Sequence, residues 1–176
     1  MTNRDLLLKL DATVIGHTEA KKALINALSR QKIRHYQKYV QKVDSEHLLE
    51  LSNVMLIGAS GTGKTYLVDS LCKMLKVPFV RLDASHFNPS GASGGVKAEH
   101  MFSIVKSKVM GLQEANEALK ATAVRELIDK AVIFVDEIDK ISSHYEGSTG
   151  NWQEHTQSTF LSIFENKEDL QGITFV

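Results

Sequence analysis

The sequence is poor in cysteine, proline and aromatic residues and carries no net charge. Its 176 residues include one cysteine and two prolines, and 7% of them are aromatic. A single thiol cannot form an internal disulfide, so Cys72 indicates a reducing compartment, and we expect a cytoplasmic protein. Acidic and basic residues number 21 each, which excludes a global field for nucleic acid or membrane and leaves only a local basic patch open.

Long hydrophobic runs are also missing from the sequence. No apolar stretch approaches the ~18 residues that a membrane span needs. Charged residues interrupt the apolar start of the chain, so we expect no secretory signal. The composition, 43% hydrophobic and 24% charged, is typical of one globular domain with an apolar core.

Compact apolar runs alternate with helical periodicity along the chain. The predicted strands are 54–57, 78–82, 131–135 and 173–176, and the predicted helices are 18–42, 64–75, 97–110, 114–130 and 152–164. Thr18 is the expected N-cap of the first of these helices, and Gly111 the expected break between two later ones. Continuously apolar strands between helices favour an α/β fold, with a parallel β-sheet sandwiched between helices.

The apolar stripe expected along the first predicted helix, which is rich in basic residues, repeats at helical spacing. Its members are Ala20, Ala23, Leu24, Ala27 and Leu28. The basic side chains of the same segment are expected to form a solvated face, and contact with a polyanion is the alternative.

A phosphate-binding signature follows the first predicted strand. Residues 58–65, GASGTGKT, match G-x-x-x-x-G-K-[ST] in full, between an apolar run and an amphipathic helix. Lys64 is expected to contact the β- and γ-phosphates of ATP or ADP, and the Thr65 hydroxyl to ligate Mg²⁺. The residues expected to hold the nucleotide here are Ser60, Gly61, Thr62, Gly63, Lys64, Thr65 and Tyr66. The alternative is a glycine-rich turn that binds nothing.

Two acidic residues end the most hydrophobic predicted strand. Asp136 and Glu137 directly follow Val132-Ile-Phe-Val135, and ligands bind at the carboxyl ends of strands in open α/β sheets. Asp136 is expected to hold the metal, through water, and Glu137 to deprotonate the attacking water. Two solvated acids at a strand end would be the plain alternative.

Beyond these motifs, three stretches carry a resemblance to a known family. The segments 10–22, 79–85 and 136–141, the last reading DEIDKI, resemble the AAA+ module of the ClpX and HslU family of protein unfoldases. The resemblance covers about residues 10–176 and implies a P-loop NTPase fold. It makes residues 1–176 the large, nucleotide-binding subdomain of an AAA+ module.

The same resemblance implies a function. It predicts an ATPase that assembles into a ring, which is expected to be a hexamer. This ATPase would use ATP hydrolysis to unfold or remodel a protein client. A partner protease would fit the same family. By this resemblance Val14 and Ile15 contact the adenine base, although both could be ordinary core residues.

Two departures from the family pattern bear on this function. The family has an aromatic residue in a loop that grips polypeptide, whereas residues 91–94 here read GASG. The family's sensor residue, arginine finger and helical lid would follow Val176, so we expect the 176-residue chain to be weakly active or inactive. The 85–96 loop is rich in glycine and serine and is expected to be mobile.

Other classes remain as alternatives. A small-molecule P-loop kinase has a similar length, and a nucleotide-dependent assembly module would need no catalytic carboxylate. Residues 91–95 satisfy G-x-S-x-G, but no buried strand precedes them as a serine nucleophile requires. The scattered histidines and lone cysteine predict no structural zinc.

Overall fold

The computed structural model describes residues 2–84, 100–139 and 172–176. Its α-helices are α1 (Asn3–Thr13), α2 (Thr18–Tyr36), α3 (Lys64–Leu75), α4 (Met101–Glu114) and α5 (Val124–Ile128). A π-helix, η1 (Gln37–Gln41), continues α2, and two short 3₁₀ helices are η2 (Ser45–His47) and η6 (Glu117–Leu119). The strands are β1 (Phe79–Asp83), β2 (Val132–Asp136) and β3 (Thr174–Phe175).

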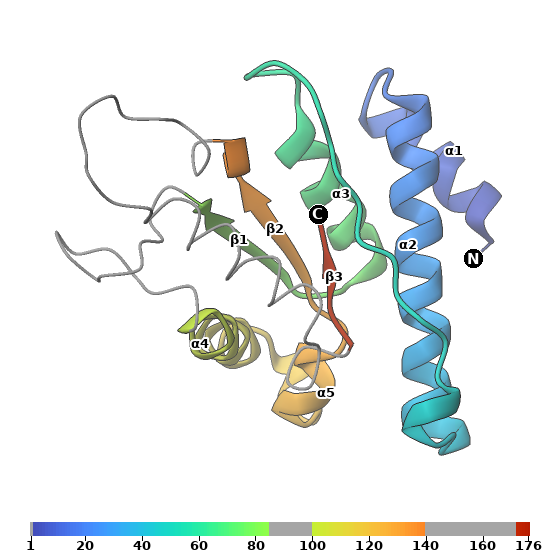
Figure 1. Ribbon diagram of the computed structural model, residues 1–176, viewed down its shortest axis with the longest axis vertical. Helices are drawn as coiled ribbons and strands as arrows, with labels where there is room; N and C mark the ends of the chain where they lie inside the picture. Colours follow the sequence, from blue (N-terminus) through green and yellow to red (C-terminus); the bar gives the residue numbers. More distant parts are fainter. Residues whose placement is uncertain (1, 85–99, 140–171) are drawn as a thin grey trace, which may run out of the picture.

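The three strands form one parallel sheet in the order β1-β2-β3 (Figure 1). The register pairs Arg81 with Phe134 and Ile133 with Phe175. Parallel neighbours need crossover connections, and α4 and α5 lie in the connection from β1 to β2. The predicted α/β class with a parallel sheet is therefore confirmed.

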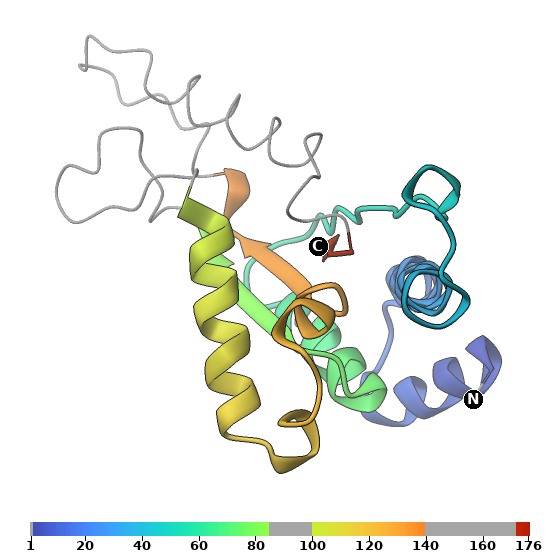
Figure 2. The ribbon, with the colours of Figure 1, turned by 90° about the horizontal axis from the view of Figure 1, so that it is seen from below.

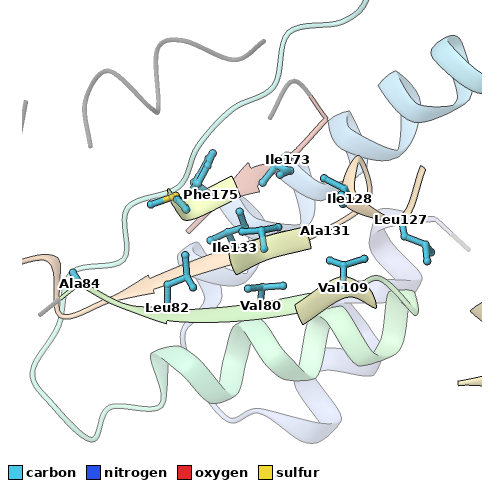
Figure 3. Close-up of a cluster of buried hydrophobic side chains, with 12 residues drawn as sticks. Val80, Leu82, Ala84, Val109, Leu127, Ile128, Ala131, Ile133, Ile173 and Phe175 are labelled. Atoms are coloured by element: carbon cyan, nitrogen blue, oxygen red, sulfur yellow. The ribbon is translucent and has the colours of Figure 1, made fainter. Parts of the chain in front are cut away.

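Helices cover both faces of the sheet, with α4 and α5 on one side and α1, α2 and α3 on the other (Figures 1 and 2). Successive side chains of β2 alternate between the two faces, so Val132 and Phe134 join the core on the α1–α3 side while Ile133 joins the core on the α4–α5 side. Figure 3 shows Val80, Leu82 and Ile133 in the α4–α5 core. Burial on both faces explains why β2 is apolar without interruption.

The prediction of a strand at 54–57 is wrong. The segment runs extended beside β3, where the Val54 N–H donates to the Phe175 carbonyl at 3.0 Å, but it does not form a regular strand. Only Val54 and Leu56 pack into the α1–α3 core, while Met55 and Ile57 are exposed. The side chains of these four consecutive apolar residues therefore alternate between the core and solvent.

Two predicted helix boundaries are also wrong. The N-cap of α2 is His17, in the left-handed region, and Thr18 is the first helical residue. Gly111 does not break a helix, because α4 continues through it to Glu114. A glycine inside a helix costs only ~1 kcal/mol, which the buried face of α4 offsets.

The apolar stripe of α2 is confirmed in part. Leu24, Ala27 and Leu28 are buried as predicted, but Ala23 is exposed and Lys21 is buried in its place. The predicted loop at 85–96 and the predicted helix at 152–164 lie outside the described residues. Of the helices that are described, none combines the length and apolar character that crossing a membrane demands.

Candidate functional site

The phosphate loop, residues 58–65, wraps around the amino end of α3. Gly61 and Gly63 have φ of 78° and 84°, in the left-handed region that glycine adopts without strain. A Cβ at Gly58 would lie 3.3 Å from the Thr62 hydroxyl oxygen, so the loop is closely folded on that side. The backbone therefore favours glycine at Gly61 and Gly63, and a larger residue at Gly58 would displace the Thr62 side chain.

Lys64 folds back over this loop. Its Nζ donates to the carbonyl of Gly58 at 2.6 Å and to that of Ala59 at 2.9 Å. The Thr62 hydroxyl donates to the same Ala59 carbonyl at 2.9 Å. The ammonium group is therefore held over the loop, where a phosphate could exchange for the two carbonyls.

The other predicted residues of the loop are open to ligand. Ser60, Gly61, Thr62 and Tyr66 are exposed, and Gly63, Lys64 and Thr65 are half-buried. The apolar residues of α3, Leu67, Val68 and Leu71, are buried in the α1–α3 core. The helix thus anchors the loop through one face and presents its amino end to solvent.

The acidic pair ends β2 as predicted. Asp136 is the last residue of the strand, and Glu137 follows with a left-handed φ of 57°. The Glu137 N–H donates to Asp136 Oδ1 at 3.1 Å. In Figure 1 the carboxyl end of β2 and the amino end of α3 lie toward the same end of the molecule.

Arg81 is a site residue that the motifs do not reveal. Its Nη2 lies 2.6 Å from Asp136 Oδ2, and its side chain is 59% exposed. The pairing follows from the β1–β2 register, which sets Arg81 diagonally opposite Asp136. The only sequence signal would be an arginine in the strand that neighbours β2, the strand that ends in the acidic pair. This signal can be used only once the strand order is known.

The two predicted adenine contacts lie in different environments. The Val14 side chain is buried in the α1–α3 core, whereas Ile15 is 94% exposed. Ile15 therefore offers apolar surface to a ligand, and Val14 fixes the chain beside it.

The residues present fit a magnesium nucleotide. The Thr65 hydroxyl and the Asp136 carboxylate are oxygen ligands of the kind Mg²⁺ prefers, and Mg²⁺ is commonly held by one or two carboxylates together with substrate phosphates. Among the described residues, no group of three or more His, Cys, Asp or Glu side chains forms an all-protein metal site.

A glycine-rich phosphate loop at the start of a helix, with an acidic pair at the carboxyl end of a neighbouring buried strand, defines the class of P-loop nucleoside triphosphatases. Residues 54–176 match the family described as "ATPase family associated with various cellular activities (AAA)". The chain belongs to this AAA family of ATPases.

The chain is also similar to the ClpX proteins of two strains of Porphyromonas gingivalis, each named "ATP-dependent Clp protease ATP-binding subunit ClpX". Identity to each is 36% over 134 residues, which is 76% of this chain and 28% of the relative. The predicted resemblance to ClpX-like AAA+ ATPases is confirmed. The matched part spans little more than a quarter of those relatives.

Proposed function

We propose that this chain is the nucleotide-binding part of an AAA+ ATPase that binds ATP or ADP with Mg²⁺ and hydrolyses ATP. The observation that carries the proposal is the complete phosphate loop at the amino end of α3 together with Asp136 and Glu137 at the end of β2. A glycine-rich turn that binds nothing would not be expected to occur together with an acidic pair at the end of a buried strand, and the reverse also holds.

The roles follow from the chemistry of each group. Lys64 and the backbone N–H groups of the phosphate loop neutralise charge on the phosphates, and the helix start adds a positive dipole. Thr65 and Asp136 would hold Mg²⁺, which when bound supplies further neutralisation of the phosphate charge. Glu137 accepts the proton of the water that attacks the γ-phosphate.

The wider function rests on the relatives. The name of the similar ClpX proteins describes an ATP-binding subunit of an ATP-dependent protease. We therefore propose that ATP hydrolysis here serves to unfold or remodel a protein client, in a hexameric ring, with a partner protease and in the cytoplasm. Residues 1–176 form the large subdomain of that module, and Val14 and Ile15 lie against the adenine.

The test is a binding titration of three proteins with a fluorescent ATP analogue and Mg²⁺. Lys64→Ala should weaken binding about tenfold or more, because a lost charge-assisted contact costs roughly 1.5–3 kcal/mol. Glu137→Gln, the matched control, should bind as wild type does, since an amide keeps the size of the carboxylate. Any ATP turnover measured for wild type should fall roughly 10²–10⁴-fold in Glu137→Gln.

Equal affinities of wild type and Lys64→Ala would refute the phosphate site. Unchanged turnover in Glu137→Gln would remove Glu137 as the base, and transfer of phosphate to a small acceptor would then favour a kinase. Nucleotide binding without turnover in the full-length protein would favour an assembly module.

A further inference from the structure

Lys21 is a lysine with almost no contact with solvent. It is 1% exposed and is the largest of the fully buried side chains among the described residues. Lysine is almost never fully buried unless its charge is paired, because desolvation of an ammonium group is costly. Lys21 needs partners, and they identify what it does.

Both polar partners of Lys21 Nζ lie at the junction of α1 and α2. The ammonium donates to Asp11 Oδ1 at 2.6 Å and to the backbone carbonyl of Val14. Asp11 belongs to α1 and is 48% exposed, so its other oxygen can remain hydrated. Lys21 therefore ties the first turns of α2 to the end of α1 and to the chain that follows it.

The segment thus tied, residues 14–17, has an unusual backbone. Gly16 and His17 are both left-handed, with φ of 75° and 56°. His17 is the N-cap of α2 but makes no side-chain capping bond. A non-glycine residue keeps such a conformation only where its surroundings impose it. Here the surroundings are the Val14 side chain in the core and the Lys21 ammonium on the Val14 carbonyl.

Val14 of the 14–17 segment shares a core with α3, the helix that begins at the phosphate loop. Val14 packs in the same cluster as Leu67 and Val68, one turn into the helix that carries the phosphate loop. The amino ends of α2 and α3 lie at the same end of the molecule (Figure 1). Ile15 presents an almost fully exposed apolar side chain there.

We propose that Lys21 is a positioning residue for nucleotide binding: it fixes the 14–17 segment so that Ile15 meets the base. The proposal rests on the proposed function, in which Val14 and Ile15 lie against the adenine. Lys21 itself touches no ligand. Its effect is confined to the base end of the nucleotide, because its partners belong to the 14–17 segment and to α1, and none to the phosphate loop.

The test separates base binding from phosphate binding. Mg²⁺–ATP and inorganic triphosphate with Mg²⁺ are titrated against wild type and Lys21→Met by calorimetry. Methionine keeps most of the length and apolar volume of the side chain and removes the ammonium. ATP affinity should fall about fivefold or more, and triphosphate affinity should stay within twofold, so that their ratio decreases.

Gln31→Met is the matched control, because Gln31 is a second buried polar residue of α2. Its Nε2 donates to the carbonyls of Ala131 and Gly172, both at 2.8 Å, away from the 14–17 segment. This variant should lower thermal stability and leave the ATP-to-triphosphate ratio as in wild type. A merely structural role of Lys21 would give the same pattern as Gln31→Met.

Asp11→Asn is the second variant, for the case that Lys21→Met does not fold. Asp11 is half-exposed, and asparagine keeps an oxygen that can accept from Lys21 but removes the negative charge that pairs with the ammonium. The ratio should shift in the same direction by a smaller factor. An unchanged ratio in the folded variants, or equal losses for both ligands, would overturn the proposal. A wild-type chain that binds neither ligand would instead overturn the proposed function itself.

Discussion

At the scale of single residues, the two charges expected at the phosphate end of the site already have protein partners. Lys64 contacts two carbonyls, and Asp136 contacts Arg81 and the Glu137 N–H. A phosphate oxygen carries a negative charge that a backbone carbonyl lacks, so the Lys64 ammonium gains Coulomb attraction when it exchanges its carbonyl partners for phosphate. The exposed Arg81–Asp136 pair contributes only about 0–1 kcal/mol, which a divalent cation can exceed.

Cys72 allows a prediction at the same scale. The thiol is buried on α3, and burial raises its pKa to about 12, with Asp69 acting in the same direction. The thiolate is the reactive form, so native protein should not react with a thiol reagent at mildly alkaline pH. In denaturant the one thiol should react completely. Rapid labelling of the native chain would show that α3 opens or that the thiol is accessible.

At the scale of elements, α2 and the π-helix that continues it hold the turns leading into β2 and β3. Gln31 reaches across to the carbonyls of Ala131 and Gly172. The buried Asp129 carboxylate accepts from Lys38 and from the Tyr39 hydroxyl at 2.8 Å. A π-helix orients the Lys38 and Tyr39 side chains differently from a continued α-helix. The π-helical turn η1 therefore lets both side chains reach Asp129.

Gly172 is the closest approach at this junction, and it gives a paired test. A Cβ there would lie 2.6 Å from Asp129 Cα, so Gly172→Ala must displace backbone and should destabilise by about 1–3 kcal/mol. Gly111 lies within α4 with nothing within 4 Å of such a Cβ. Gly111→Ala should therefore stabilise by roughly 0.5–1 kcal/mol. Denaturant unfolding of both variants checks this, and shifts of the same sign would contradict it.

Elements that depend on local pattern were predictable, and those that depend on partners were not. The phosphate loop, α3 and β2 follow from glycine positions, apolar spacing and an uninterrupted buried run. Arg81 could not be assigned, because its partner is 55 residues away and is set by strand register. Lys21 reads as one more charge on a basic helix until Asp11 and the Val14 carbonyl are seen beside it.

The segment at 54–57 also shows that local pattern alone does not determine what covers a side chain. Its apolar letters predict burial on both faces, as in β2. In the structure one face of the segment packs and the other does not, which leaves Ile57 90% exposed. Composition cannot distinguish the two cases, because what covers the second face is a property of the fold.

At the scale of the whole molecule, the buried polar junction makes stability depend on pH. His35, on α2, stacks on Tyr39 and lies 3.1 Å from Glu126 Oε1, with a side chain only 14% exposed. Burial lowers its pKa, as does the nearby Lys130, while Glu126 and Asp129 act in the opposite direction. The folded state therefore binds a proton on His35 less readily than the unfolded state does.

The sign of the effect follows from this order of pKa values. Stability from His35 is complete above the ordinary histidine pKa of about 6.5 and is lost as pH falls from there through the lower folded value. Glu126 acts in a separate, more acidic window. Its pKa is lowered, chiefly by the hydrogen bond from Lys130, so its contribution is lost only below the ordinary glutamate pKa of about 4.3.

We therefore expect the unfolding midpoint to fall as the pH is lowered through the histidine range, and this slope to be reduced in His35→Gln. The slope is compared, rather than the midpoint alone, because the substitution also changes packing against Tyr39. His47, which is exposed in η2, supplies the control, and His47→Gln should keep the wild-type slope. A wild-type slope in His35→Gln would mean that another group takes up the proton on unfolding. The junction between α2 and α5 would then not be the acid-sensitive part of the molecule.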